Sequence, residues 1–496
     1  MDLFYTSTRD DSVRVKASQA VLQGLSAEGG LFVPEEIPAL DRGLEELAGM
    51  TYQEIAFEVM KLFLTDFTRE ELLHCIEKAY DSKFDTPEIV PVREADGVSY
   101  LELFHGPTIA FKDMALSILP HLMTTAAGKN QVQDEIVILT ATSGDTGKAA
   151  LAGFAKVPGT RIVVFYPKDG VSPIQEKQMV TQKGKNTFVV GIRGNFDDAQ
   201  SGVKEIFGDA VLKAEMKAAG FRFSSANSIN IGRLVPQIVY YVYACARLYK
   251  KGALKEGGTV NAVVPTGNFG NILAAYYAKR MGLPLGRLIC ASNENRVLYD
   301  FFRTGCYDRN REFILTSSPS MDILISSNLE RLIYEIGGRD SGKAAALMKR
   351  LSEEGSYEIT PDMQEKLGDF YGNYASEEET AAAIRRIYEK TGYVLDPHTA
   401  VAEGVYEKYR AETGDEKVTV IASTASPFKF TGSVMKGLGQ ECGAADDFEL
   451  ADRLSGLSGT EIPGAVREIR NAEVLHHRVV EVKDMKTAVK EFLGLA

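Results

Sequence analysis

The sequence predicts an α/β protein in which parallel sheets are covered by helices, preceded by a mainly helical N-terminal domain. From about residue 90 onward, short apolar β-branched runs alternate with helical patterns, which is typical of parallel sheets buried on both faces. The composition supports this interpretation, because 496 residues with 45% hydrophobic and 25% charged side chains can bury the cores of two or more domains.

The N-terminal region, residues 1–92, has a different pattern. Apolar positions at helical spacing predict helices over 52–64 and 68–80. Residues 26–34, SAEGGLFVP, read as a turn followed by a buried strand or loop. We interpret this region as a structural cap and expect no catalytic residue in it.

Five strand–helix pairs are expected in the alternating part of the chain. They join the strands 136–140, 161–166, 188–192, 260–264 and 288–292 to the helices 148–156, 173–183, 196–218, 272–281 and 294–304. Ligands should bind just beyond the carboxyl ends of these strands. Residues 338–380 are more polar and helical, and residues 371–376, YGNYAS, are interpreted as a mobile loop.

Charge and composition exclude several classes of function. The formal net charge of −12 disfavours nonspecific nucleic-acid binding. The longest apolar runs are strand-sized, so no membrane association is expected. The histidines lack metal-ligand spacing, and no metal site is expected. An N-terminus without an apolar signal core suggests no export, and five scattered cysteines without CxxC spacing fit a reducing cytosol, so a cytoplasmic protein is expected.

Residues 104–115, FHGPTIAFKDMA, place Lys112 in an apolar and conformationally restricted setting. Gly106-Pro107 marks a turn, and helical spacing resumes at Met114, so Lys112 is expected where a loop enters a helix. The helix dipole and burial would both disfavour its ammonium form. Lys112 is therefore a candidate Schiff-base former, and the alternative is a solvated surface lysine.

Residues 140–148, TATSGDTGK, directly follow a predicted strand. Small residues allow close backbone approach, and the free amides of the following helix suit an anion. A Walker A loop does not fit, because Thr142 stands where its first glycine is required and Ala149 follows Lys148. A simple helix-capping turn is the other interpretation.

Four further segments carry polar groups at loop positions. Residues 265–271, PTGNFGN, follow a strand and open a helix, as in a phosphate-binding nest or an ordinary turn. Residues 420–430, VIASTASPFKF, are a strand and then a loop containing Thr424. Residues 224–234 contain Asn230, whose amide can form hydrogen bonds, and Arg233, whose forked guanidinium is suited to phosphate. Residues 172–178 add a second cation, Lys177. For Arg233 and Lys177, the alternative is a surface position.

In order and over nearly the full length, these blocks resemble those of the threonine synthases. The resemblance is to the longer branch, with its N-terminal domain and GGLFVP run, of the fold-type II (tryptophan synthase β-like) enzymes that use pyridoxal 5'-phosphate (PLP). It implies that Lys112 binds PLP covalently through a Schiff base. It also implies a large PLP-binding domain, residues 93–134 and 223–496, with a small domain, residues 135–222, inserted in it.

The resemblance also assigns the other site residues. The cofactor phosphate would be bound by Gly267, Asn268, Phe269, Gly270 and Asn271. Thr424 would meet the pyridine nitrogen and Asp145 the ring. Contacts to the substrate carboxylate would come from Thr142, Ser143, Gly144 and Thr146, and contacts to its phosphate from Lys177, Asn230 and Arg233. The sequence departs from the family pattern at Asp145, Ser426 and Phe428, where asparagine, histidine and alanine are usual.

The implied activity is threonine synthase. O-phospho-L-homoserine and water would become L-threonine and phosphate by PLP-dependent γ-elimination and β-addition, in a monomer or homodimer. The nearest alternative is another β-family PLP lyase, such as a serine/threonine dehydratase or a phospho-lyase. A nucleotide-binding regulatory protein and an inactive PLP-binding protein are the remaining interpretations.

Overall fold

Two sheets organise the computed structural model, which describes residues 2–142 and 144–495. The strands of the larger sheet are β4 (Val92–Ala95), β5 (Val98–Glu102), β10 (Val260–Pro265), β11 (Leu285–Ser292), β14 (Phe370–Tyr374) and β15 (Thr419–Ser423). Their order is β14-β11-β10-β15-β5-β4, and every pairing is parallel except that of β4 with β5. The α/β fold predicted from strand–helix alternation is confirmed.

The smaller sheet is parallel throughout. Its strands are β6 (Glu135–Ala141), β7 (Thr160–Pro167), β8 (Thr187–Arg193), β9 (Phe221–Ser224) and β16 (Val479–Glu481), in the order β16-β8-β7-β6-β9. In β6, Ile136 and Ile138 enter one hydrophobic cluster, whereas Val137 and Leu139 enter another. This alternation is what a strand covered on both faces requires.

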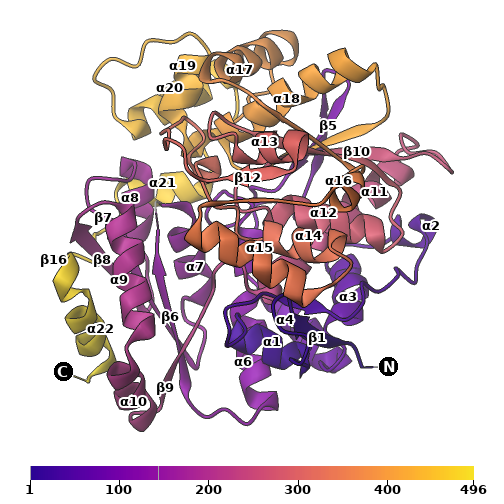
Figure 1. The fold of residues 1–496 in the computed structure, drawn as a ribbon. Helices are drawn as coiled ribbons and strands as arrows, with labels where there is room; N and C mark the ends of the chain where they lie inside the picture. The colour runs from indigo at the N-terminus through magenta and orange to yellow at the C-terminus, as the bar shows by residue number, and fades with distance from the viewer. Residues whose placement is uncertain (1, 143, 496) are drawn as a thin grey trace.

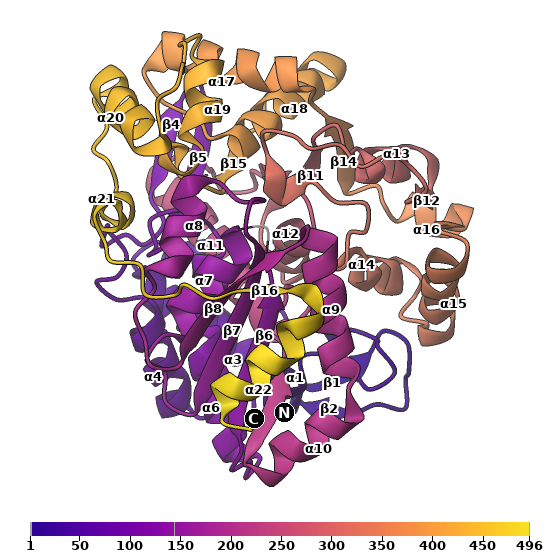
Figure 2. The ribbon, with the colours of Figure 1, turned by 90° about the vertical axis from the view of Figure 1, so that its left-hand side faces the viewer.

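Helices cover both faces of the smaller sheet (Figure 2). They are α7 (Asp145–Phe154), α8 (Pro173–Val180), α9 (Phe196–Gly208), α10 (Ala210–Ala218) and α22 (Met485–Leu493). The single helix expected over 196–218 is divided at Asp209. The Asp209 carboxylate accepts a hydrogen bond from the Leu212 amide at 2.9 Å, so it begins a new helix there.

The larger sheet is covered in the same way. Its helices are α5 (Asp113–Leu116), α11 (Ile231–Lys250), α12 (Gly270–Arg280), α13 (Val297–Thr304), α17 (Glu377–Thr391), α18 (Pro397–Thr413) and α19 (Thr431–Gly437). Helix α6 (Leu119–Lys129) instead packs mainly against α1 (Ala17–Gln23) and α4 (Arg69–Ala79) of the N-terminal region. In β10, Val264 joins the cluster that contains α11 and α12, and Val263 joins the cluster of α17 and α18. Figure 1 shows α17, α18 and α19 together at the top of the molecule.

The N-terminal region is mainly helical, as predicted. It consists of β1 (Phe4–Ser7), β2 (Val15–Lys16), α1 (Ala17–Gln23), β3 (Phe32–Pro34), α2 (Leu44–Leu47), α3 (Tyr52–Phe63) and α4 (Arg69–Ala79). Capping boxes begin α3 at Thr51 and α4 at Thr68. Tyr52 packs edge-on against Tyr243 of α11, which joins the region to the larger sheet's helices.

Shorter elements complete the outer layers. They are β12 (Cys306–Asp308), η1 (Pro319–Met321), α14 (Leu329–Ile336), α15 (Ser341–Glu353), β13 (Ser356–Glu358), α16 (Pro361–Glu365), η2 (Pro427–Lys429), α20 (Asp447–Ser458), α21 (Gly464–Arg470) and η3 (Val482–Asp484). Among the described helices, none is long and apolar enough to cross a membrane.

Interpreting residues 371–376 as a mobile loop was wrong. Residues 370–374 form β14, which pairs in parallel with β11 over five residues. Polar side chains hid this strand, but they find partners at the sheet edge. The Tyr371 hydroxyl donates to Glu412 at 2.6 Å, and Asn373 donates to the Tyr371 hydroxyl at 2.8 Å.

The C-terminal segment returns to the smaller sheet. β16 pairs with β8, and Met485, Val489 and Leu493 of α22 are buried in the cluster that includes α9. Figure 2 shows this segment, in yellow, crossing from α21 to β16 and α22. Sheet membership therefore places 221–224 and 479–493 with the predicted small domain, although the sequence assigned them largely to the large one.

Candidate active site

Four of the predicted segments, residues 104–115, 140–148, 265–271 and 420–430, meet where β5, β6, β10 and β15 end. Lys112 lies at the N-terminus of α5, as expected. Its loop is fixed to the end of β15, because the Phe111 amide donates to the Thr424 carbonyl at 2.8 Å. Inside the loop, the Asp113 carboxylate accepts from the amide and hydroxyl of Thr108 at 2.8 and 2.6 Å. Thr424, which is buried, is thereby held beside Lys112.

The Lys112 amine is buried rather than solvated. Its side chain is 11% exposed, and Nζ donates to Ser320 Oγ at 3.0 Å and lies 3.6 Å from Asp145 Oδ2. Burial, assisted by the positive charges of Lys429 and Arg233, lowers the pKa of Lys112 to about 8 despite the nearby Asp145. The interpretation of Lys112 as a surface lysine is therefore excluded.

Asp145 is the carboxylate at the centre of this cluster. Lys429 Nζ lies 3.0 Å from its Oδ1, Gln175 donates to Oδ1 at 3.0 Å and Ser320 donates to Oδ2 at 2.8 Å. Burial acts to raise the pKa of Asp145, but the charges of Lys429 and Lys112 outweigh it and hold this pKa well below its usual range. Asp145 is thus an ionised acid between two lysines.

Sequence reasoning missed three members of the cluster. Lys429 lies within the quoted block 420–430, and its side chain is completely buried. A lysine in an apolar run after a strand was the available signal, since lysine is rarely buried without a partner. Gln175 lies in the segment 172–178, but Ser320 belongs to η1, where the sequence carries no recognisable motif.

Residues 267–271 form a nest of free backbone amides. The carbonyl of Gly267 accepts from Ser326 Oγ at 2.7 Å, and the carbonyl of Asn268 accepts from Asn328 Nδ2 at 3.0 Å. Because trans peptides are planar, the next amides point away from these bonds. Phe269 has φ +63°, which turns the chain into α12. Within the described chain, the amides of 267–271 donate to no protein acceptor.

Asn271 adds a side-chain donor to the nest. Its Oδ1 accepts from the hydroxyls of Tyr240 and Tyr241 at 2.7 and 2.6 Å. Its Nδ2 is buried and has no partner among the described residues. A buried donor without a partner is costly unless a ligand satisfies it. Free amides, a helix N-terminus and this orphan donor fit a phosphate dianion.

Arg233 is a further buried cation of the candidate site. It is buried, and Nη1 donates to the Ala226 carbonyl at 3.1 Å. Its Nε and Ser228 Oγ are buried and lack partners among the described residues. Burial lowers the pKa of Arg233 to about 10, and its charge acts on Lys112. A buried guanidinium with spare donors is suited to an anion.

The other two residues predicted for the substrate phosphate differ from Arg233. Asn230 caps α11: its Oδ1 accepts from the Gly232 amide, and its Nδ2 donates to the carbonyls of Val21 and Ser225. Both polar atoms of the Asn230 side chain are therefore hydrogen-bonded to other parts of the protein. Lys177 is half-buried on α8, the helix that carries Gln175.

The loop after β6 presents the start of α7. Thr142 Oγ1 accepts from the amides of Gly144 and Gly147 at 2.9 and 3.0 Å, so this hydroxyl shapes the loop. Gly144 has φ +132°, and a Cβ there would lie 2.5 Å from Gln175, so only glycine fits. Thr146 is half-buried in the first turn. Ser143 lies outside the described residues.

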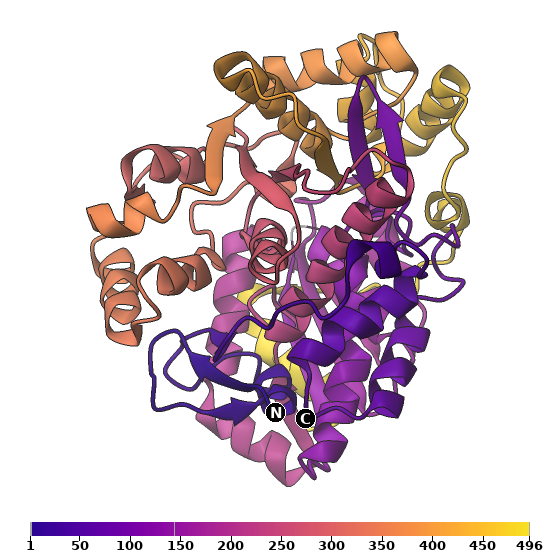
Figure 3. The ribbon, with the colours of Figure 1, turned by 90° about the vertical axis from the view of Figure 1, so that its right-hand side faces the viewer.

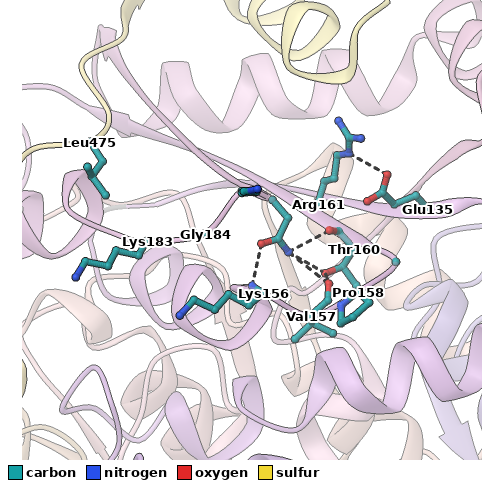
Figure 4. A pocket seen from close by; sticks show the side chains of 12 residues that line it. Glu135, Lys156, Val157, Pro158, Thr160, Arg161, Lys183, Gly184 and Leu475 are labelled. Carbon is teal, nitrogen blue, oxygen red and sulfur yellow. Dashed lines mark hydrogen bonds and ion pairs between the residues drawn. The ribbon is translucent and has the colours of Figure 1, made fainter.

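A large cavity beside the smaller sheet lies apart from the candidate site. It measures about 840 Å³ and is lined by residues at the amino ends of the strands, such as Glu135, Thr160 and Lys183 (Figure 4). None of the predicted site residues lines it. The candidate site is at the carboxyl ends of the strands, where ligands bind in open α/β sheets.

A buried amine of lowered pKa beside a preformed phosphate nest is what PLP requires of a protein. The residues of this chain fit that cofactor, and residues 94–424 match the family model described as pyridoxal-phosphate dependent enzyme. Fold and site thus define a PLP-dependent enzyme of fold type II.

The regions on either side of this match identify the family within the PLP-dependent enzymes. Residues 4–80 match the model of the threonine synthase N terminus, and residues 399–491 match that of the threonine synthase C-terminal region. The threonine synthase of Schizosaccharomyces pombe is 39% identical over 462 residues, covering 87% of this chain and 88% of that protein. The chain belongs to the threonine synthase family.

Solved structures agree with this assignment. The crystal structure of threonine synthase from yeast has a TM-score of 0.88 at 32% identity and covers 99% of both chains. PLP-bound threonine synthase from Brucella melitensis has a TM-score of 0.87 at 34% identity and covers 99% of this chain and 98% of that one. Human threonine synthase-like 1 is 42% identical over 85% of this chain. The chain spans 58% of the length of that relative.

Proposed function

We propose that this chain is a threonine synthase, converting O-phospho-L-homoserine and water to L-threonine and phosphate. The observation that carries the proposal is a second anion position. The amide nest suffices for the cofactor phosphate, yet Arg233 provides a buried cation with unused donors whose charge acts on Lys112. A PLP lyase acting on an unphosphorylated amino acid needs only the nest.

Binding of cofactor and substrate divides among the blocks. Lys112 holds PLP covalently, the nest and Asn271 hold its phosphate, and Thr424 meets the ring nitrogen. The amides that open α7 and the hydroxyl of Thr146 bind the substrate carboxylate. Arg233 binds the substrate phosphate, with Lys177 as a further cation.

Proton transfer falls to Lys112. When bound, PLP supplies an electron sink that makes protons at Cα and then Cβ removable. The Lys112 amine, freed when the substrate amino group replaces it on the cofactor, would take these protons. Its pKa of about 8 suits a group that accepts and returns protons near neutrality. Phosphate leaves from Cγ, and one proton is returned to Cγ. Water then adds its hydroxyl group at Cβ, its remaining proton balances the released phosphate, and the second proton is returned to Cα. Asp145, 3.6 Å from Nζ, stabilises the ammonium while it carries a proton.

The reaction is tested by supplying O-phospho-L-homoserine and measuring threonine and phosphate. We expect equal amounts of the two products, and Lys112→Ala should abolish both. Keto-acid formation from serine or threonine without phosphate release would instead support the dehydratase alternative. A Lys112→Ala variant that retained turnover would contradict the assignment altogether.

Arg233 allows a test that separates the two anion sites. Arg233→Ala should raise KM for phosphohomoserine at least tenfold while PLP remains bound, because the nest does not involve this side chain. The exposed Arg14, paired with Glu35 at 2.6 Å, offers a control substitution. Loss of PLP from Arg233→Ala would mean that the two phosphate positions are exchanged.

A further inference from the structure

Arg331 is a buried arginine outside the cluster around Lys112. It lies on α14 and is 0% exposed. Its guanidinium donates to the Phe32 carbonyl at 2.9 Å, to the Ile229 carbonyl at 2.6 Å and to Asn328 Oδ1. These acceptors are all neutral oxygens. Burial lowers the pKa of Arg331 to about 10, so it remains a cation at neutral pH.

The three acceptors come from three parts of the fold. Phe32 belongs to β3 of the N-terminal region, Ile229 precedes α11, and Asn328 directly precedes α14. Burying a cation against neutral oxygens is unfavourable compared with an apolar residue. The rigid, forked guanidinium instead fixes the positions of these three segments relative to one another.

Asn328 connects Arg331 to the amide nest. Its Nδ2 and its backbone amide both donate to the Asn268 carbonyl, at 3.0 and 3.1 Å. Because Arg331 binds Oδ1, the side-chain amide can present only Nδ2 to Asn268. The Asn268 carbonyl is thereby held on the outside of the loop. The Phe269 amide of the same peptide points into the nest.

The N-terminal region contacts the first turn of α14 at a second residue, Glu330. Glu330 accepts from Arg9 Nε and Nη2 at 2.8 and 2.7 Å and from Thr8 Oγ1 at 2.5 Å. Glu330 is 4% exposed. Figure 3 shows the N-terminal strands, in indigo, next to the segment that carries α14 and α15.

We propose that Arg331 is a positioning residue that couples docking of the N-terminal region to the geometry of the phosphate nest. Through Asn328 it sets how tightly the nest binds the PLP phosphate. The N-terminal region is then part of the cofactor site and more than a cap. This inference rests on the placement of the cofactor phosphate in the proposed function.

The test measures PLP affinity of the apoenzyme and compares it with the affinity for pyridoxal, which lacks the phosphate. Arg331→Met and Asn328→Ala should each weaken PLP binding about tenfold or more. Neither should change pyridoxal binding more than about twofold. Since Arg331 acts through Asn328, the double variant should bind PLP no more weakly than Asn328→Ala alone. The ³¹P resonance of bound PLP should also shift in each variant.

Arg339 supplies a matched control. It also ties the N-terminal region to the end of α14, donating to the Pro34 carbonyl and to Glu335, but it does not contact Asn328. Arg339→Met should lower the melting temperature and leave PLP affinity unchanged. Equal losses of PLP affinity in Arg331→Met and Arg339→Met would overturn the proposal, because general loosening of the N-terminal region would then explain both.

Gly267→Ala distinguishes failure of this inference from failure of the site. If Gly267→Ala weakens PLP binding while Arg331→Met and Asn328→Ala do not, the nest is correct and the coupling is wrong. If none of the three changes PLP affinity, the cofactor phosphate is not in the nest. Should Arg331→Met fail to fold, Asn328→Ala tests the same connection with a smaller change.

Discussion

The protonation of Lys112 gives the most direct prediction. Covalent attachment of PLP requires the neutral amine, and burial lowers the pKa of this group from 10.5 to about 8. The rate of PLP attachment to the apoenzyme should therefore rise with pH and reach half its maximum near pH 8. Stopped-flow absorbance measures this rate. A midpoint above pH 10 would show that Lys112 behaves as a solvated lysine.

Lys429 offers a way to shift that midpoint. Its charge lowers the pKa of Lys112 and also neutralises Asp145. In Lys429→Met, Asp145 would act on Lys112 without opposition, so the attachment midpoint should move to higher pH by about one unit or more. Lys436→Met, at an exposed position of α19, should leave the midpoint unchanged. A downward shift in Lys429→Met would contradict this account.

His105 precedes the Gly-Pro turn and predicts a pH-dependent stability. Burial lowers its pKa, but hydrogen bonds to Asp85 at 2.5 Å and Glu102 at 3.0 Å outweigh burial and raise it to about 9. A raised folded-state pKa gives stability that is complete below about pH 6.5 and is lost as pH rises through 9. Since Asp85 is half exposed, we expect a contribution on the order of 2 kcal/mol.

The measurement is the difference in unfolding free energy between the wild type and His105→Gln. This difference should be largest near pH 6 and should shrink toward pH 10. Using the difference removes the opposite trend from Lys112, whose lowered pKa makes folding more favourable as pH rises. The exposed His74 provides the control His74→Gln. A difference that is constant with pH would show that the His105 pairing contributes nothing.

Gly267 shows how an element is built around a ligand. A Cβ at this position would lie 2.5 Å from the Ser320 carbonyl, so the nest and the segment carrying Ser320 could not both keep their places. Gly267→Ala should weaken PLP binding at least tenfold, measured by titration of the apoenzyme. Gly128→Ala, where a Cβ meets nothing within 4 Å, should leave PLP affinity unchanged and should slightly stabilise α6.

The sequence predicted these elements well where local patterns determine them. Buried parallel strands are continuous apolar runs, so β6, β7, β8, β10 and β11 were found, and the loops after them followed. Local patterns gave the wrong secondary structure where a contact with another part of the chain determines it. Asp209 divides a helix because it caps the next one, and β14 is a strand because β11 pairs with it.

The site shows the same division. Lys112 and residues 267–271 lie in short continuous motifs, and the structure brings them together. Ser320 and Asn328 reach the site from a segment without a motif, because only the folded chain places them against Lys112 and Asn268. Likewise, the tyrosines that hold Asn271 belong to α11 and read simply as buried helix positions.

At the level of the whole molecule, the cluster around Lys112 joins the two sheets. Asp145 follows β6 of the smaller sheet, whereas Lys112 and Lys429 follow β5 and β15 of the larger one. The relative position of the sheets thus determines the electrostatics of the amine. The C-terminal segment also spans both sheets, because α20 packs in the cluster of α17 and α18 while α22 packs on the smaller sheet.

The C-terminal segment should therefore stabilise the smaller sheet in particular. Deleting residues 479–496 would expose the edge of β8 and the apolar face that now covers Met485, Val489 and Leu493. Each of these side chains is worth about 1.5–3 kcal/mol when buried, so we expect a loss of roughly 5 kcal/mol. Hydrogen exchange should accelerate in β7 and β8 while β10 and α11 stay protected.

A point substitution tests the same idea without shortening the chain. Val489→Asp places a charge in the buried face of α22, whereas Thr487→Asp alters an exposed position of the same helix. Val489→Asp should lower the melting temperature and accelerate exchange in β8, and Thr487→Asp should do neither. If exchange rose equally in both sheets, the two would unfold as one unit, and the segment would stabilise the whole molecule instead of its smaller half.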